Sequence, residues 1–160
     1  MERPVRKNNR LPDYNYADPG GYFVTICTSA RENLFWTNAE SPLEQGEPLP
    51  LTPTGKIVSD LIDAIPDQYP AISVPCSVVM PNHVHMIIMI NTDQDGNPQP
   101  APSLQETVRQ FKGAVTKRVG RPIWQKSFYE HVIRNRREAE TIMQYIAENP
   151  LAWNLDEYMK

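Results

Sequence analysis

The sequence is poor in cysteine and contains no long hydrophobic run. Its two cysteines, Cys27 and Cys76, lack the number needed for a disulfide framework and the close spacing of a zinc site. We expect both to be reduced and buried, as in a cytoplasmic protein. The most apolar stretch, residues 77–90, contains Pro81, Asn82 and two histidines and is shorter than the roughly 20 residues of a membrane-spanning helix. The N-terminus also lacks a basic segment followed by an apolar one, so neither a secretory signal nor a membrane partner is expected.

The length of 160 residues predicts one domain that spans residues 1–160. It is too short for a β/α barrel, which needs about 250 residues. Residues 1–20 are polar and rich in turn formers, which predicts an extended arm. Residues 38–50 and 92–102 are acidic and proline-rich, which predicts two surface loops.

The formal net charge of −3 argues at first sight against a nucleic-acid partner. The charge is unevenly distributed, however, because residues 103–137 carry nine basic and two acidic side chains. This basic block could face phosphates, or it could be a set of solvated helix faces. The candidate DNA-binding residues in it are Arg109, Lys112, Lys117, Arg118, Arg134, Arg136 and Arg137.

Hydrophobic periodicity predicts both strands and helices. The expected strands span residues 21–28, 71–80, 83–90 and, less regularly, 128–133. The expected helices are capped by Thr52, Ser103 and Asn135, with the first ending before Pro66 and the third running to Pro150. The third should bury a stripe of Ala139, Ile142, Met143 and Ile146. This order predicts an α+β, ferredoxin-like fold, with a mainly antiparallel sheet and helices packed on one face.

Two histidines begin the strand at residues 83–90. His83 and His85 share one face of that strand, because successive side chains alternate between faces, and two imidazoles so placed can chelate one metal ion. They could equally be polar residues of the hairpin. Two histidines that faced the core would be costly unless they were satisfied, and this favours a metal or catalytic site. A histidine-triad hydrolase is excluded, because Ile87 stands where the third histidine would be.

A second polar pair lies near the end of the third helix. Tyr145 and Asn149 are four residues apart and therefore share one helix face, at the border of the apolar stripe. Both could reach one site. The pattern also fits a tyrosine at the rim of the core and an asparagine at a helix end.

Four motifs, VVMPNHVHMII, FKGAVTKR, WQKSFYEHVIRN and YIAENPLAW, occur in this order between about residues 9 and 153. Together they resemble the REP-associated tyrosine transposases, a branch of the single-tyrosine HUH transposases, named after a histidine–hydrophobic–histidine motif. The resemblance covers nearly the whole chain.

This resemblance implies a role for each candidate residue. His83, His85 and Asn149 would hold a divalent metal, magnesium or manganese, and Tyr145 would be the nucleophile. The substrate would be single-stranded or hairpin DNA, cut and rejoined at palindromic sites through a 5′-phosphotyrosine. Relatives act as monomers or as homodimers. At the position of Asn149 the wider insertion-sequence enzymes have glutamine, which is one methylene longer.

Two other functions are compatible with the sequence. The chain could be a domesticated DNA-hairpin-binding protein without strand transfer, although the intact candidate residues argue against that loss. It could also be a metal-dependent phosphodiesterase that acts on small nucleotides, for which the basic block would be superfluous. The remaining notable residues, Tyr129, His131, Trp124 and Phe128, are expected to be structural or to contact DNA.

Overall fold

The computed structural model describes residues 20–155, and the side chains of residues 20–153. Its strands are β1 (Gly20–Cys27), β2 (Ile72–Val79), β3 (His83–Ile90) and β4 (Tyr129–Ile133). Its α-helices are α1 (Pro53–Gln68), α2 (Leu104–Val119) and α3 (Arg136–Glu148). Two 3-10 segments, η2 (Ser29–Arg31) and η3 (Asn149–Leu155), follow β1 and α3.

The four strands form one sheet in the order β2-β3-β1-β4, and every neighbouring pair is antiparallel. Helix α1 connects β1 to β2 across the sheet, and α2 connects β3 to β4. This is the β-α-β-β-α-β arrangement of ferredoxin-like folds. The predicted α+β class and antiparallel sheet are therefore confirmed, as is the hairpin that joins β2 and β3.

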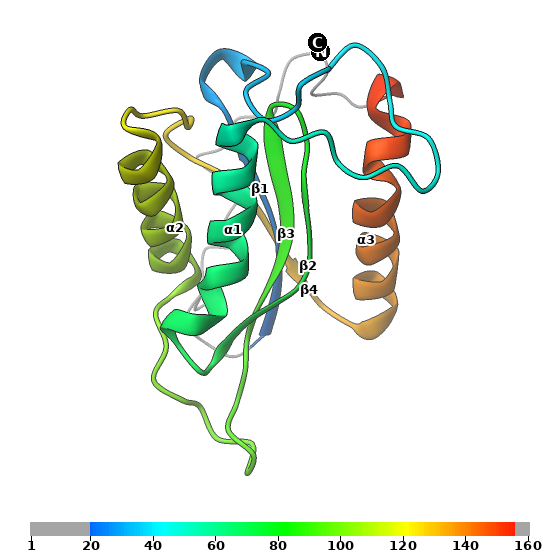
Figure 1. Ribbon diagram of the computed structural model, residues 1–160. Helices are drawn as coiled ribbons and strands as arrows, with labels where there is room; N and C mark the ends of the chain where they lie inside the picture. The colour runs from blue at the N-terminus through cyan, green and yellow to red at the C-terminus, as the bar shows by residue number, and fades with distance from the viewer. Residues whose placement is uncertain (1–19, 156–160) are drawn as a thin grey trace.

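The helices cover both faces of the sheet. Helices α1 and α2 lie side by side on one face, whereas α3 lies on the other (Figure 1). The prediction that the helices share one face is correct for α1 and α2 and wrong for α3. Successive side chains of a strand point to opposite faces of the sheet, and the central strand β3 is buried along almost its whole length, so both of its faces must be covered.

The three predicted caps are present. The side chains of Thr52, Ser103 and Asn135 each accept a hydrogen bond from a backbone N–H three residues later. Helix α1 does not end before Pro66 as predicted but continues to Gln68. Proline removes a single helical hydrogen bond there, and the burial of Ile65 keeps the last turn packed on the core.

The end of α3 also differs from the prediction. The α-helix ends at Glu148, and the chain continues through Pro150 in the 3-10 segment η3. Of the predicted apolar stripe only Ile146 is buried, while Met143 is 41% exposed. Helix α3 therefore packs on the sheet mainly through its C-terminal half.

The remaining predictions concern loops, termini and cysteines. Residues 38–50 and 92–102 contain no helix or strand, as expected. The predicted arm lies outside the described residues, except for Gly20, which begins β1. Cys27 is buried and Cys76 partly buried, and neither forms a disulfide. Within the part of the chain that the structure describes, no helix is both long and apolar enough to cross a membrane.

Candidate functional site

The two histidines of β3 converge on the face of the sheet that α3 covers. His83 is fully buried and His85 is 2% exposed. Their Nε2 atoms lie 3.1 Å apart, and the ring planes meet at 74°. The alternation predicted from the sequence therefore brings the same ring nitrogen of both residues to one point.

The other ring nitrogen of each histidine contacts a buried polar side chain. The Nδ1 atom of His83 lies 2.8 Å from Oδ1 of Asn82. The Nδ1 atom of His85 lies 2.8 Å from Oγ1 of Thr25, which stands directly opposite His85 in the β1–β3 ladder. Each ring is therefore held through its Nδ1 atom, and the Nε2 atoms of the two rings point toward each other.

The environment of His85 keeps its imidazole neutral. Burial lowers the pKa of His85 to about 3, because the charged form loses its hydration. A metal ligand must be unprotonated at the coordinating atom. His85 therefore meets this condition at any pH at which the protein is expected to work.

Helix α3 brings Tyr145 to the histidines. Its ring packs edge-on against His85, with 5.4 Å between the ring centroids, and edge-on against Phe23, with 6.2 Å. Phe23 in turn stacks on His85 at 5.3 Å. Although it contacts these rings, Tyr145 is 44% exposed. A substrate can therefore reach its side chain from solvent.

Asn149 is flanked in sequence by two residues whose rings pack against the histidines. Tyr145, four residues before it, contacts His85, and Trp153, four residues after it, has its ring centroid 6.2 Å from that of His83. Asn149 is 4% exposed, and its Oδ1 atom is buried and has no hydrogen-bond partner among residues 20–153. A buried carbonyl oxygen without a partner is energetically costly, so this atom requires an explanation.

These donors fit a small divalent metal site. Metal–imidazole bonds of about 2.1 Å place two ligand nitrogens roughly 3 Å apart, which agrees with the 3.1 Å between the Nε2 atoms. The unpartnered oxygen of Asn149 would be the third donor. Among residues 20–153 there is no group of three His, Cys, Asp or Glu side chains that could hold a metal.

A second tyrosine, Tyr129, lies on a more distant strand of the sheet. Tyr129 stands opposite Thr25 in β4, two strands away from His85 on the same face, which corresponds to roughly 10 Å. Its neighbour His131 lies 2.9 Å from the carboxylate of Glu138 on α3. That contact holds β4 to the first turn of α3. Trp124 and Phe128 are buried in the core.

The predicted basic block is divided between the two sides of the sheet. Arg109, Lys112, Lys117 and Arg118 lie on α2, whereas Arg134, Arg136 and Arg137 lie just before or at the start of α3 (Figure 1). Lys112 donates hydrogen bonds to the carbonyl oxygens of Gln125 and Lys126. Arg109 is bound to Glu106 at 2.6 Å. The other five basic side chains are exposed.

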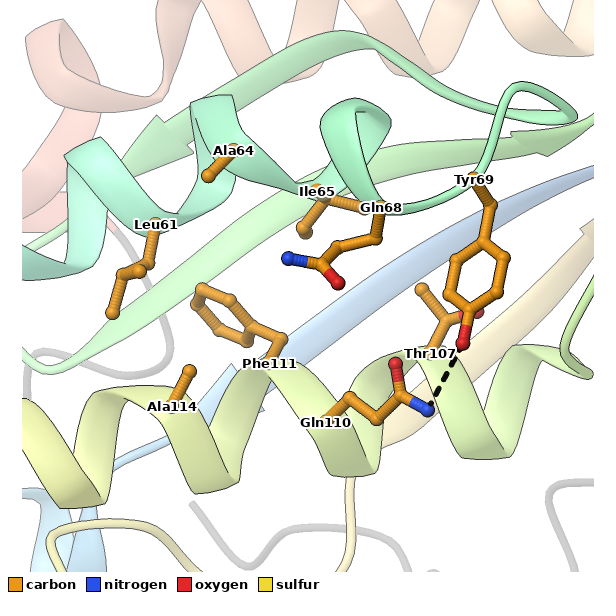
Figure 2. Close-up of a pocket in the computed structure, with 9 residues that line it drawn as sticks. All are labelled: Leu61, Ala64, Ile65, Gln68, Tyr69, Thr107, Gln110, Phe111 and Ala114. Carbon is orange, nitrogen blue, oxygen red and sulfur yellow. Dashed lines mark hydrogen bonds between the residues drawn. The ribbon is translucent and has the colours of Figure 1, made fainter.

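A cavity on the other side of the sheet lies away from these residues. It has a volume of about 330 Å³ and is formed between α1 and α2, where Leu61, Ile65 and Phe111 line it and Tyr69 and Gln110 meet at its rim (Figure 2). None of the candidate site residues lines it. The site is therefore defined by side chains on the opposite face of the sheet.

Four residues of the site were not singled out from the sequence. Phe23 and Thr25 flank His85 from β1, Asn82 contacts His83, and Trp153 closes the cluster from η3. Finding Thr25 and Phe23 requires the register between β1 and β3, which the sequence does not contain. Asn82 could have been found, because it directly precedes the histidine pair.

Comparisons with other proteins give two relatives from Haemophilus influenzae. An uncharacterized protein is 32% identical over 171 residues, which cover 95% of this chain and 92% of the relative. A protein named "Putative REP-associated tyrosine transposase" is 27% identical over 90 residues, about half of each chain. No protein-family model matches the sequence.

Solved structures with the same fold include two transposases. The structure of a REP-associated tyrosine transposase bound to a REP hairpin has a TM-score of 0.60 and 25% identity, and it covers 88% of this chain and 72% of the other. A "putative transposase" from Deinococcus radiodurans has a TM-score of 0.50 and 18% identity and covers 87% of this chain and 95% of the other, which shows the fold alone. By its fold, its four sequence motifs and these relatives, the chain is similar to the REP-associated tyrosine transposases.

Proposed function

We propose that this chain is a transposase that cleaves and rejoins single-stranded DNA at hairpin sites through a 5′-phosphotyrosine. One observation carries the proposal. An accessible tyrosine, Tyr145, contacts His85 of a buried histidine pair, and Asn149, one helical turn further along, has a buried amide oxygen without a hydrogen-bond partner among the described residues. The relative that was solved with a REP hairpin supports hairpin DNA as the substrate.

His83, His85 and Asn149 would hold the metal, for which we propose magnesium or manganese. The metal would supply electrophilic activation of the scissile phosphate. Imidazole nitrogens also suit zinc and other late metals, whereas magnesium prefers oxygen ligands. Oxygens of the DNA phosphate and of water would complete the coordination in either case.

Tyr145 would act as the nucleophile. Its Oη atom would form a bond to phosphorus while the bond from phosphorus to the 3′ oxygen breaks, and the leaving oxygen would take up a proton to give a free 3′ hydroxyl. The 5′ phosphate would remain on the tyrosine. Attack of a 3′ hydroxyl on this phosphotyrosine would reverse the step, so rejoining needs no ATP. With a pKa near 3, His85 is a poor base at neutral pH and is better suited to bind than to accept the tyrosine proton.

Incubation with labelled DNA tests this proposal. The full chain is mixed with end-labelled single-stranded hairpins taken from inverted repeats near its gene, with manganese or with a chelator. We expect cleavage and a labelled protein band that survives denaturation, both dependent on the metal. Binding without either product would indicate instead a hairpin-binding protein that has lost strand transfer.

A further inference from the structure

The two histidines have different partners at their Nδ1 atoms, although both contacts measure 2.8 Å. His83 meets an amide oxygen and His85 meets a hydroxyl. Thr25 and Asn82 are buried like the histidines, with 4% and 1% exposure. Water therefore has little access to these contacts, and the partner's chemistry decides where the histidine proton lies.

Asn82 allows a single tautomer of His83. An amide oxygen only accepts hydrogen bonds, so the contact with Oδ1 requires the proton of His83 on Nδ1. The Nδ2 atom of Asn82 points to the carbonyl oxygen of Arg31 at 3.4 Å, which keeps Oδ1 turned toward the histidine. The Nε2 atom of His83 then carries a lone pair at all times.

Thr25 allows both tautomers of His85, because a hydroxyl can donate or accept. Without a metal, two bare lone pairs 3.1 Å apart would repel each other. A hydrogen bond between the Nε2 atoms therefore requires the proton of His85 on Nε2, and Thr25 then donates to Nδ1. When both Nε2 atoms bind a metal, the proton must lie on Nδ1 of His85, and Thr25 must accept it.

We propose that Thr25 is a positioning residue that reverses the direction of its hydrogen bond when a metal binds, while Asn82 holds His83 permanently in the binding tautomer. The inference rests on the proposed function, because it assumes that His83 and His85 bind a metal. It assigns a different task to each supporting side chain. The pair can thus be satisfied without a metal and still bind one without moving either ring.

Manganese binding by the full-length protein tests the role of Thr25. Isothermal titration calorimetry compares wild type with Thr25→Val, which keeps the shape but not the hydroxyl, and with Thr25→Ser, which restores it. Loss of such a supporting partner typically lowers metal affinity by about 10–100-fold. We expect that loss for Thr25→Val and near wild-type affinity for Thr25→Ser. The matched control is Thr107→Val on α2, on the other face of the sheet. It removes a buried hydroxyl that donates a hydrogen bond to the carbonyl oxygen of Ser103.

Nitrogen NMR of the imidazoles tests the tautomers without any activity measurement. In the metal-free wild type, His83 should be protonated on Nδ1 and His85 on Nε2. Addition of zinc or magnesium, used here in place of manganese, should move the proton of His85 to Nδ1. Equal manganese affinity of wild type and Thr25→Val would overturn the role of Thr25 alone. Absence of manganese binding to wild type would overturn the metal assignment, and a His85 proton on Nδ1 before metal addition would overturn the reversal.

Discussion

Tyr145 packs edge-on against His85, with ring centroids 5.4 Å apart and ring planes at 63°. The two residues are 60 positions apart in sequence and come from a helix and a strand on one side of the sheet. Because His85 is fixed by Thr25 and by Phe23, the contact places an accessible phenol beside an immobile imidazole.

The first prediction concerns the unpartnered oxygen of Asn149. Replacing Asn149 with leucine removes a buried polar group of similar volume, whose unsatisfied cost is about 1–3 kcal/mol. We expect the free energy of unfolding of the metal-free protein to stay constant or rise, while stabilisation by manganese disappears. Urea unfolding with and without the metal measures both effects.

The control for this variant is Asn135→Ala, which removes the cap of α3. It should lower the free energy of unfolding by about 1 kcal/mol and leave the effect of manganese intact. A strongly destabilised Asn149→Leu protein without metal would show that the amide oxygen has a partner that matters for folding.

The second prediction concerns the metal itself. A ligand that binds only the folded state at 100 times its dissociation constant stabilises a protein by about 2.7 kcal/mol. We expect manganese to raise the melting temperature of wild type and to have no effect on His83→Asn or His85→Asn. These variants should also lose DNA cleavage. Asparagine is preferable to alanine here, because both histidines are fully or almost fully buried and truncation would leave a cavity.

The third prediction concerns pH in the presence of a chelator. The pKa of His85 is about 3 in the folded protein and near 6.5 in an unfolded chain. Between these values the unfolded state binds one more proton, so stability falls as the pH falls from 6.5 toward 3, by up to about 1.4 kcal/mol per pH unit from this group. Carboxylates such as Glu138, whose pKa is lowered by the Arg134 N–H and by His131, change stability in the same direction.

Comparing the pH dependence of the free energy of unfolding between wild type and His85→Asn isolates the contribution of His85. The free energy of unfolding of His85→Asn should fall less steeply with acid than that of wild type between pH 6.5 and 4. Parallel curves for the two proteins would mean that His85 titrates normally and is open to water.

The fourth prediction concerns the divided basic block. Because Tyr145 lies on α3, we expect the DNA to follow the side of the sheet that carries Arg136 and Arg137. Replacing either with glutamine should weaken hairpin binding and reduce the slope of log affinity against log salt by about one. Lys117→Gln and Arg118→Gln on α2 are the matched controls. Fluorescence anisotropy at several salt concentrations makes the comparison, with a blunt duplex of equal length expected to bind more weakly.

The opposite order of effects would place the DNA against α2. Equal effects from both sets would indicate a hairpin that wraps around the edge of the sheet. DNA that lay only against α2 would count against Tyr145 as the nucleophile, because α2 and α3 cover opposite faces of the sheet, whereas a hairpin that wraps around the edge would still reach Tyr145.

Local patterns predicted most of the fold. The caps at Thr52, Ser103 and Asn135 and the alternation in residues 83–90 depend on neighbours in sequence, and each is found in the structure. The extension of α1 past Pro66 and the position of α3 on the second face depend on packing between distant segments. The spacing of apolar residues along the sequence does not show which distant segments pack together.

The geometry of the candidate site was predictable to a similar extent. That His83 and His85 share one face follows from a period of two, which is a local property, whereas the contact of Tyr145 with His85 is a tertiary contact. Thr25 was missed, because its place opposite His85 is set by the register of β1 against β3. The division of the basic residues between the two sides of the sheet could not be predicted either, because it depends on how α2 and α3 pack on the sheet.

The last prediction concerns the nucleophile. Tyr145→Phe keeps the ring that packs against His85 and Phe23 but removes the oxygen, so we expect no cleavage and no covalent complex. DNA binding should survive, because the lost oxygen is one atom at the edge of a much larger contact. Incubation with labelled hairpin DNA and manganese, followed by denaturing electrophoresis, detects the covalent band.

Tyr129→Phe is the matched control, because Tyr129 lies on the same sheet face but two strands from His85. That variant should still form the covalent complex, since its ring is not the one in contact with the histidine pair. A band that persists in Tyr145→Phe and disappears in Tyr129→Phe would move the nucleophile to β4. The backbones of β4 and β3 are roughly 10 Å apart across β1, so the ring of Tyr129 would then have to reach over Thr25 to bring its oxygen to a phosphate at the histidine pair.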